Sequence, residues 1–84
     1  MKSFRARIEV KLKAGYLDPE GETVKGALSY LGYSVSSVGT SRVYEIRFSA
    51  ASKEEARRIA EEMCRRLLSN PVKDEYSFEI TEEG

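Results

Sequence analysis

Few side chains in this 84-residue chain have the types and spacing that catalysis requires. Cys64 is the only cysteine, and there is no histidine. Histidine is the commonest general base near neutral pH and the commonest metal ligand, so its absence argues against an autonomous enzyme. Cys64 lies on an apolar stripe between Met63 and Leu67, far from a helix N-terminus that would lower its pKa. We therefore expect Cys64 to be a packing residue.

The remaining candidates for chemistry are acidic residues and glycines near the start of a predicted helix. Glu20 and Glu22 flank Gly21, but two carboxylates alone do not make an acid–base pair, and we interpret them as solvated charges at a helix start. There is no Cys-x-x-Cys pair for a metal. Gly15, Gly21 and Gly32 lack the spacing of a phosphate-binding loop. The sequence therefore predicts no catalytic residue, no metal site and no cofactor bound by this chain.

Composition narrows the class of protein further. Fourteen basic and fourteen acidic residues give a net charge of zero, which provides no general attraction to nucleic acid or to an anionic membrane. No apolar stretch reaches the roughly 20 residues of a membrane span, and the N-terminus lacks the apolar core of a signal peptide. A single cysteine fits a reducing cytoplasm. We expect one domain over residues 1–84, small enough to gain stability from an oligomer interface.

Periodicity predicts the elements of the first half. Apolar and charged residues alternate strictly from Phe4 to Lys13, which indicates a long strand with one buried face. A turn at Gly15 and Tyr16 leads to Asp18, which can cap a helix with Pro19 in its first turn. Gly32 is a suitable helix stop. The apolar stripe of this helix consists of Val24, Ala27, Leu28 and Leu31.

The second half predicts two short strands, a helix and a last strand. The strands cover about 34–38 and 43–49, with a hairpin turn at 39–41 between them. Ser52 and Glu55 make a capping box for the helix, which ends at Asn70-Pro71. The apolar stripe of the helix consists of Ala56, Ile59, Ala60, Met63, Cys64, Leu67 and Leu68. The last strand places Tyr76, Phe78 and Ile80 inward.

The resulting order, β-α-β-β-α-β, is typical of a ferredoxin-like α+β fold, an antiparallel sheet with both helices on one face. The first and last strands are neighbours in that fold. Residues 1–13 carry five basic side chains and one acidic, whereas residues 74–84 carry five acidic and none basic. We interpret this asymmetry as cross-strand charge pairing. A basic patch for a partner is the alternative.

Two binding modules share this order of elements. RNA-recognition modules stack bases on aromatic residues of the open sheet face, but here the aromatic residues share the phase of the core, so we do not expect nucleic-acid binding. A stand-alone regulatory module of the ACT type, which binds a small molecule, remains an alternative because nothing in the local sequence excludes it.

Two motifs resemble the PurS family, the small accessory subunits of phosphoribosylformylglycinamidine synthase. The first is Leu17-Asp18-Pro19-Glu20-Gly21 leading into Val24, Ala27-Leu28 and Leu31-Gly32. The second is Met63-Cys64 leading into Leu67-Leu68, Asn70-Pro71-Val72 and Tyr76. The resemblance covers nearly the whole chain, but the segment 38–42 departs from the basic, glycine-containing pattern of the family.

The resemblance implies a subunit without an active site of its own. PurS-like proteins assemble with the glutaminase subunit PurQ and the synthetase subunit PurL. The complex uses ATP, with Mg, to convert formylglycinamide ribonucleotide and glutamine to formylglycinamidine ribonucleotide and glutamate. PurS acts as a dimeric or higher-order bridge that lets ammonia pass between the two catalytic subunits.

We also expect a homo-oligomer, a dimer or tetramer joined through sheet edges or exchanged elements. The reason is that the long first strand exceeds the strands available to pair with it and should leave backbone groups exposed. Loops on a rigid scaffold commonly carry binding function, so the turn and helix start should face other subunits. The predicted contact residues are Gly15, Tyr16, Asp18, Pro19, Glu20 and Gly21. Alternatively, Asp18 and Pro19 serve only to begin the helix.

Overall fold

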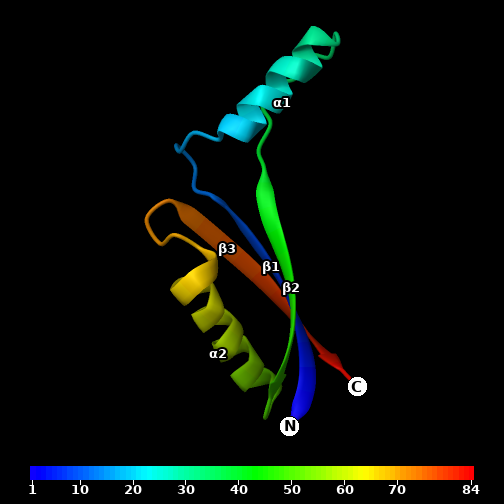
Figure 1. The fold of residues 1–84 in the computed structure, drawn as a ribbon, viewed down its shortest axis with the longest axis vertical. Helices are drawn as coiled ribbons and strands as arrows, with labels where there is room; N and C mark the ends of the chain where they lie inside the picture. Colours follow the sequence, from blue (N-terminus) through cyan, green and yellow to red (C-terminus); the bar gives the residue numbers. More distant parts are fainter.

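The computed structural model describes residues 1–84 as a three-stranded antiparallel sheet with one helix on its face and a second helix that projects from its end (Figure 1). The elements are β1 (Lys2–Leu12), α1 (Pro19–Tyr30), β2 (Ser41–Ala50), α2 (Lys53–Met63), a π-helical turn η1 (Cys64–Leu68) and β3 (Asp74–Glu83). The strand order is β2-β1-β3, so the first and last strands are neighbours, as predicted.

The central strand β1 is paired along nearly its whole length on both sides. Its pairing with β2 runs from Lys2↔Ala50 to Lys11↔Ser41, and its pairing with β3 from Ser3↔Glu83 to Leu12↔Asp74. The expectation that the first strand would outreach its partners is therefore wrong. The free edges of the sheet belong to β2 and β3.

The predicted strand over 34–38 and the hairpin turn at 39–41 are not formed. Residues 31–40 instead connect α1 to β2 without regular structure. A strand needs a neighbour for its backbone groups, and both sides of β1 are already occupied by ten-residue strands. The sheet therefore has three strands, not the four of the ferredoxin-like arrangement.

Small side chains let α2 approach the sheet closely. Ala56, Ala60 and Cys64 are fully buried at 4- and 8-residue spacing on one face of the helix. They pack over the inward side chains of β1, of which Phe4 and Ile8 are fully buried. Complete burial of each of these two contributes about 2–3 kcal/mol. Half-buried residues of β2 and β3 complete this core: Tyr44, Ile46, Phe48, Tyr76, Phe78 and Ile80.

The helix α1 does not lie on the sheet face that α2 covers. The expected pair of helices on one face is therefore not present in the protomer. Instead, α1 extends beyond the end of the sheet (Figure 1). Gly21 is its only buried residue, and Val24 and Leu31 of the predicted apolar stripe are 40% and 70% exposed. The stripe exists in the sequence but has no partner within the protomer.

The π-helical turn determines which of two leucines after α2, Leu67 or Leu68, packs against the core. With about 100° per residue, a continued α-helix would place Leu67 in the middle of the face that contains Ala60 and Cys64. The wider turn, closed by the 3.0 Å bond from Ser69 N to Cys64 O, brings Leu68 to the core instead. Leu67 is 83% exposed, so its predicted place in the core is wrong.

The open face of the sheet carries paired charges. Lys11–Glu75 joins β1 to β3 at 3.6 Å, and Arg5–Glu45 joins β1 to β2 at 3.9 Å. The predicted cross-strand pairing is thus confirmed for Lys11 and Glu75. Exposed pairs of this kind contribute at most about 1 kcal/mol each, so their main effect is to balance the charge of this face. None of the helices is long and apolar enough to cross a membrane.

Candidate subunit-contact site

Asp18 fixes the start of α1 to the segment that enters β2. Its carboxylate caps α1 by accepting a bond from Gly21 N at 2.9 Å, and it also accepts bonds from Thr40 N at 2.7 Å and Thr40 Oγ1 at 2.8 Å. The bond from Gly21 N lowers the pKa of Asp18 most, followed by the two bonds from Thr40. Asp18 therefore caps the helix, as predicted. It also attaches the helix to Thr40, for which the sequence predicts no contact with Asp18.

Gly21 allows the start of α1 to touch the segment that leads into β2. A Cβ atom at this position would lie 2.3 Å from the carbonyl oxygen of Val38, a distance that no side chain can occupy. A glycine in the first helical turn is required by this close approach of the chain to itself. Gly21 is therefore buried by its own chain, and its part in a subunit contact stays a prediction.

The turn before α1 lies beside the loop that connects η1 to β3. Gly15 has φ +93°, which turns the chain as predicted. Lys13 N donates to Lys73 O at 2.8 Å, Lys13 Nζ donates to Pro71 O at 3.1 Å, and Tyr16 OH donates to Val72 O at 3.3 Å. The structure thus joins two loops that are nearly 60 positions apart in the sequence and for which the sequence predicts no contact.

The predicted contact residues therefore fall into two groups. Asp18 and Gly21 face inward and hold α1 in place, whereas Gly15, Tyr16, Pro19 and Glu20 are exposed. Between α1 and the strand ends lies an open hollow of about 440 Å³, lined mostly by polar and charged residues, including Glu20, Arg42 and Lys73. Small-molecule sites are usually enclosed and largely apolar, so this hollow does not favour the ACT-type alternative.

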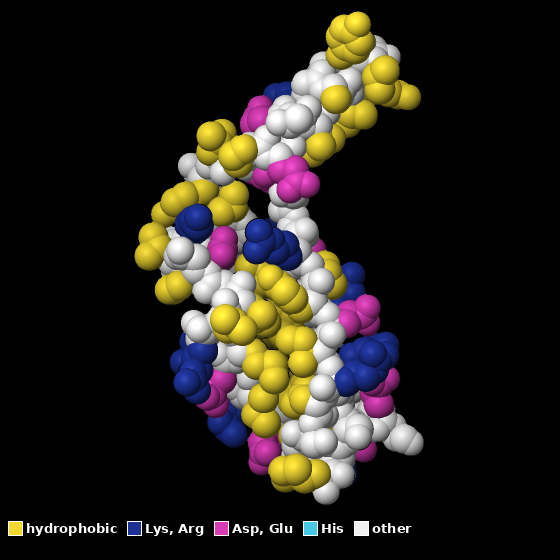
Figure 2. Space-filling view, viewed as in Figure 1, with side chains coloured by type: hydrophobic (Ala, Val, Ile, Leu, Met, Phe, Trp, Pro, Cys, Tyr) yellow, Lys and Arg dark blue, Asp and Glu magenta, His cyan; other side chains and the backbone are white.

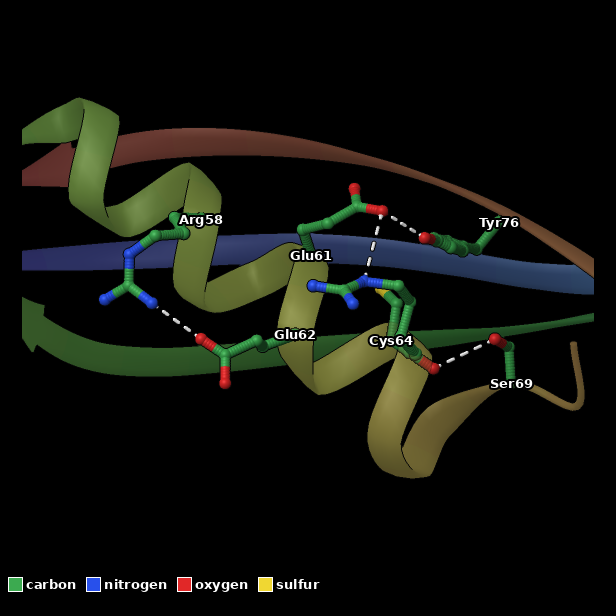
Figure 3. Close-up of polar contacts among 7 residues, drawn as sticks. Arg58, Glu61, Glu62, Cys64, Ser69 and Tyr76 are labelled. Atoms are coloured by element: carbon green, nitrogen blue, oxygen red, sulfur yellow. Dashed lines mark hydrogen bonds and ion pairs between the residues drawn. The ribbon is translucent and has the colours of Figure 1, made fainter.

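The polar residues around Cys64 form a structural cluster (Figure 3). Tyr76 OH donates a short hydrogen bond to Glu61 Oε1, and Arg65 Nε lies 3.8 Å from the same oxygen. Cys64 is fully buried; burial raises the pKa of its thiol, and the Glu61 carboxylate raises it further. The hydrogen bond to Glu61 is the main cause of the raised pKa of Tyr76. Cys64 is part of the buried core cluster, as expected for a packing residue, and a buried neutral thiol is a poor nucleophile.

Comparison with known proteins agrees with this geometry. A family model for PurS, described as phosphoribosylformylglycinamidine (FGAM) synthase, matches residues 5–82. The FGAM synthase subunit PurS of Archaeoglobus fulgidus is 47% identical over 74 residues, which are 87% of this chain and 92% of that protein. The PurS subunit of Methanocaldococcus jannaschii is 37% identical over 78 residues, or 92% of this chain and 94% of that protein.

Solved structures share the fold. The structure of Thermus thermophilus PurS superimposes with a TM-score of 0.86 at 38% identity, covering 98% of this chain and 99% of that one. A chain in the structure of PurLQS from Thermotoga maritima superimposes with a TM-score of 0.83 at 32% identity, covering 99% of this chain and all of that one. The three-stranded sheet and projecting helix are thus a shared architecture rather than an incomplete ferredoxin-like fold.

Proposed function

This chain belongs to the PurS family of FGAM synthase subunits, and we propose that it bridges the glutaminase PurQ and the synthetase PurL without an active site of its own. The observation that carries the proposal is the match over almost the full length to a chain of the Thermotoga maritima PurLQS structure. The bridge would hold the two catalytic subunits so that ammonia released from glutamine reaches the synthetase. ATP, Mg and formylglycinamide ribonucleotide would be bound by the other subunits, in the cytoplasm.

We also propose that the protomer associates with a second copy through α1. The apolar stripe of α1 is exposed, and the sheet face beside α2 has half-buried apolar residues on β2, including Tyr44 and Ile46. Figure 2 shows this hydrophobic surface running along the side of α2. Asp18 and Gly21 hold α1 away from its own sheet, so the α1 of another copy is the natural partner for that surface. Exchange of α1 between copies would bury both surfaces at once.

A reconstitution experiment tests the bridging role. Turnover to the amidine would be measured with PurL and PurQ, with glutamine or with ammonia as nitrogen donor, in the presence and absence of this protein. We expect omission to abolish the glutamine-dependent reaction and to leave the ammonia-dependent reaction of PurL. Full glutamine-dependent turnover without this protein would refute the role.

Light scattering at micromolar concentration tests the association. We expect a mass of at least twice the 9.5 kDa of one chain. Leu31→Glu places a charge on the exposed stripe of α1 and should reduce the mass toward that of one chain. A mass equal to that of one chain for the wild-type protein would refute the proposed exchange of α1.

A further inference from the structure

The outer edge of β2 has backbone groups without hydrogen-bond partners. This strand lies on one side of the three-stranded sheet and pairs only with β1. Over residues 43–49, no backbone group forms a hydrogen bond outside the sheet. In an antiparallel pair, alternate residues turn their N–H and C=O groups away from the neighbouring strand. The outward groups of this segment are therefore available to a further strand.

The edge of β2 also lacks the features that usually block pairing at an edge. Natural sheets protect their edges with proline, bulges, lysines or charges that point inward. Residues 43–49 contain no proline, glycine or lysine, and the register between β1 and β2 continues without a bulge. The inward side chains of the segment are Tyr44, Ile46 and Phe48, all half-buried. A regular strand of this kind is suited to pair with another strand.

The edge of β3 is less suited to a second copy, because the ionised side chains of β3 are all carboxylates. Two antiparallel β3 strands could not place opposite charges against each other in any register. Pairing of β2 in one copy with β3 in the next would leave a free edge at both ends, so the assembly would not close. A closed pair of copies is therefore best formed by two β2 strands.

Two antiparallel β2 strands are complementary in one register, in which a two-fold axis passes between the two copies of Ile46. Glu45 of each copy then lies opposite Arg47 of the other, and Tyr44 lies opposite Phe48. An axis at residue 45 would bring two carboxylates together, and an axis at residue 47 would bring two guanidinium groups together. Axes further along the strand leave both charges unpaired. Opposite charges stabilise a strand pair and like charges destabilise it, so the charges favour the register centred on Ile46.

Both of these charges have partners within the protomer, but each keeps atoms free for a further contact. Arg47 uses Nε to contact Glu83 Oε1 at 3.0 Å, which leaves its two terminal nitrogens as donors. Glu45 Oε2 lies 3.9 Å from Arg5 Nη1, which leaves Glu45 Oε1 as an acceptor. The side chains of Arg47 and Glu45 are 69% and 55% exposed. Pairing across the edge therefore adds to the existing contacts without breaking them.

We propose that β2 binds β2 of a second copy of this chain, antiparallel and centred on Ile46, so that the two three-stranded sheets join into one. The edge of β2 is a different surface from α1, which projects beyond the end of the sheet (Figure 1). The inference thus adds a second contact between copies and depends neither on the exchange of α1 nor on the bridging role. Two different self-complementary contacts on one protomer form a closed tetramer when their two-fold axes are perpendicular.

Two opposite charge reversals test the register. Glu45→Arg gives each β2 strand two cations, and Arg47→Glu gives each β2 strand two carboxylates, so either variant alone would place like charges against each other. In an equimolar mixture, the cations of one variant lie opposite the carboxylates of the other, and pairing is restored. Both variants also disturb the contacts with Arg5 and Glu83 inside the protomer. Mixing cannot repair those contacts, so recovery on mixing reports only the contact between copies.

The mass of each variant and of the mixture would be measured by light scattering, with circular dichroism as the check of folding. Native mass spectrometry with one variant isotope-labelled would identify mixed pairs. We expect each variant alone to have about half the mass of the wild type, and the mixture to regain the wild-type mass as mixed pairs. Arg57→Glu is the matched control, because Arg57 is exposed on α2, and it should keep the wild-type mass.

An unchanged mass of either variant alone would overturn the inference, and so would a reduced mass that mixing does not restore. Leu31→Glu separates the edge contact from the exchange of α1. If Leu31→Glu keeps the wild-type mass while the charge reversals halve it, the copies associate through their edges and the exchange of α1 is wrong. A wild-type monomer would overturn both contacts. The bridging role is judged separately, by glutamine-dependent turnover.

Discussion

The Asp18 carboxylate accepts two hydrogen bonds from Thr40, a residue 22 positions further along the chain, at 2.7 Å from its N–H and 2.8 Å from its hydroxyl. The same carboxylate caps α1. One side chain therefore both begins the helix and fixes its direction relative to β2. The helix α1 carries the surface proposed to bind a second copy. The cap at Asp18 therefore also sets the direction in which that surface is presented to the second copy.

Replacing Asp18 by Asn should reduce the Tm by several degrees, since the amide oxygen can still accept one bond but the charge-assisted bonds are lost. Thr40→Val should give a smaller decrease, because only the hydroxyl bond is removed. Glu22→Gln is the matched control, an exposed first-turn carboxylate without these bonds. Thermal unfolding followed by circular dichroism at pH 7 measures all three. Equal Tm values for the wild type and Asp18→Asn would contradict the role of Asp18.

The hydrogen bonds to the Asp18 carboxylate also predict that the stability of the protein depends on pH. The pKa of Asp18 in the folded protein lies below its ordinary value of 3.8, so the charged carboxylate favours folding. That contribution is complete above the ordinary value and is lost as the pH falls through the folded pKa. The stability difference between wild type and Asp18→Asn should therefore be constant near neutral pH and shrink below about pH 4. A difference that grew on acidification would have the wrong sign.

Two glycines of α1 should respond oppositely to substitution by alanine. Gly21→Ala would force a Cβ atom against Val38 O and should destabilise the protein by about 1–3 kcal/mol. Gly26 has nothing within 4 Å of its Cβ position, so Gly26→Ala should stabilise the helix by up to about 1 kcal/mol. Urea unfolding measures the free energy of unfolding of both variants. Comparison of the two values separates the effect of backbone crowding at Gly21 from the effect of helix propensity at Gly26. Stabilisation by both substitutions would show that α1 and residue 38 can move apart at little cost.

Local signals account for what the sequence predicted correctly. The alternation in β1, the Asp18 and Ser52 caps and the glycine stop at Gly32 each depend on a few neighbouring residues. Asp18 and Ser52 accept the expected cap bonds, and Gly32 adopts φ +98°. Glu55 differs slightly, since its side chain accepts a bond from Ala51 N rather than completing the capping box with Ser52.

The errors concern relationships between distant segments. Whether 34–38 pairs as a strand depends on the free sides of β1, and these are occupied by β2 and β3. The position of Leu67 depends on a π turn that helical periodicity does not contain. The location of α1 depends on Thr40 and Val38, neither of which carries a pattern that links it to Asp18 or Gly21. Nothing in the local sequence could have paired these residues.

Tyr76→Phe removes the hydrogen bond to Glu61 and should lower the Tm by a few degrees at neutral pH. The pKa of Tyr76 is raised above its ordinary value of 10.0, because the neutral phenol donates to the carboxylate. This contribution is complete below the ordinary value and is lost as the pH rises through the folded pKa. The difference between wild type and Tyr76→Phe should therefore narrow above about pH 10. A constant difference up to strongly alkaline pH would argue that packing, not the hydrogen bond, is responsible.

Cys64→Ala tests the role of the only thiol. The side chain is fully buried between α2 and the sheet, so removal of its sulfur should lower the free energy of unfolding by about 1 kcal/mol. Because burial and Glu61 raise the pKa of the thiol, the folded protein should react slowly with thiol reagents near pH 7 and rapidly once unfolded. Glutamine-dependent turnover of the complex should stay within about threefold of the wild-type rate, as for a small buried group remote from the reacting atoms. A variant that folds and assembles normally but abolishes turnover would show that Cys64 takes part in the reaction.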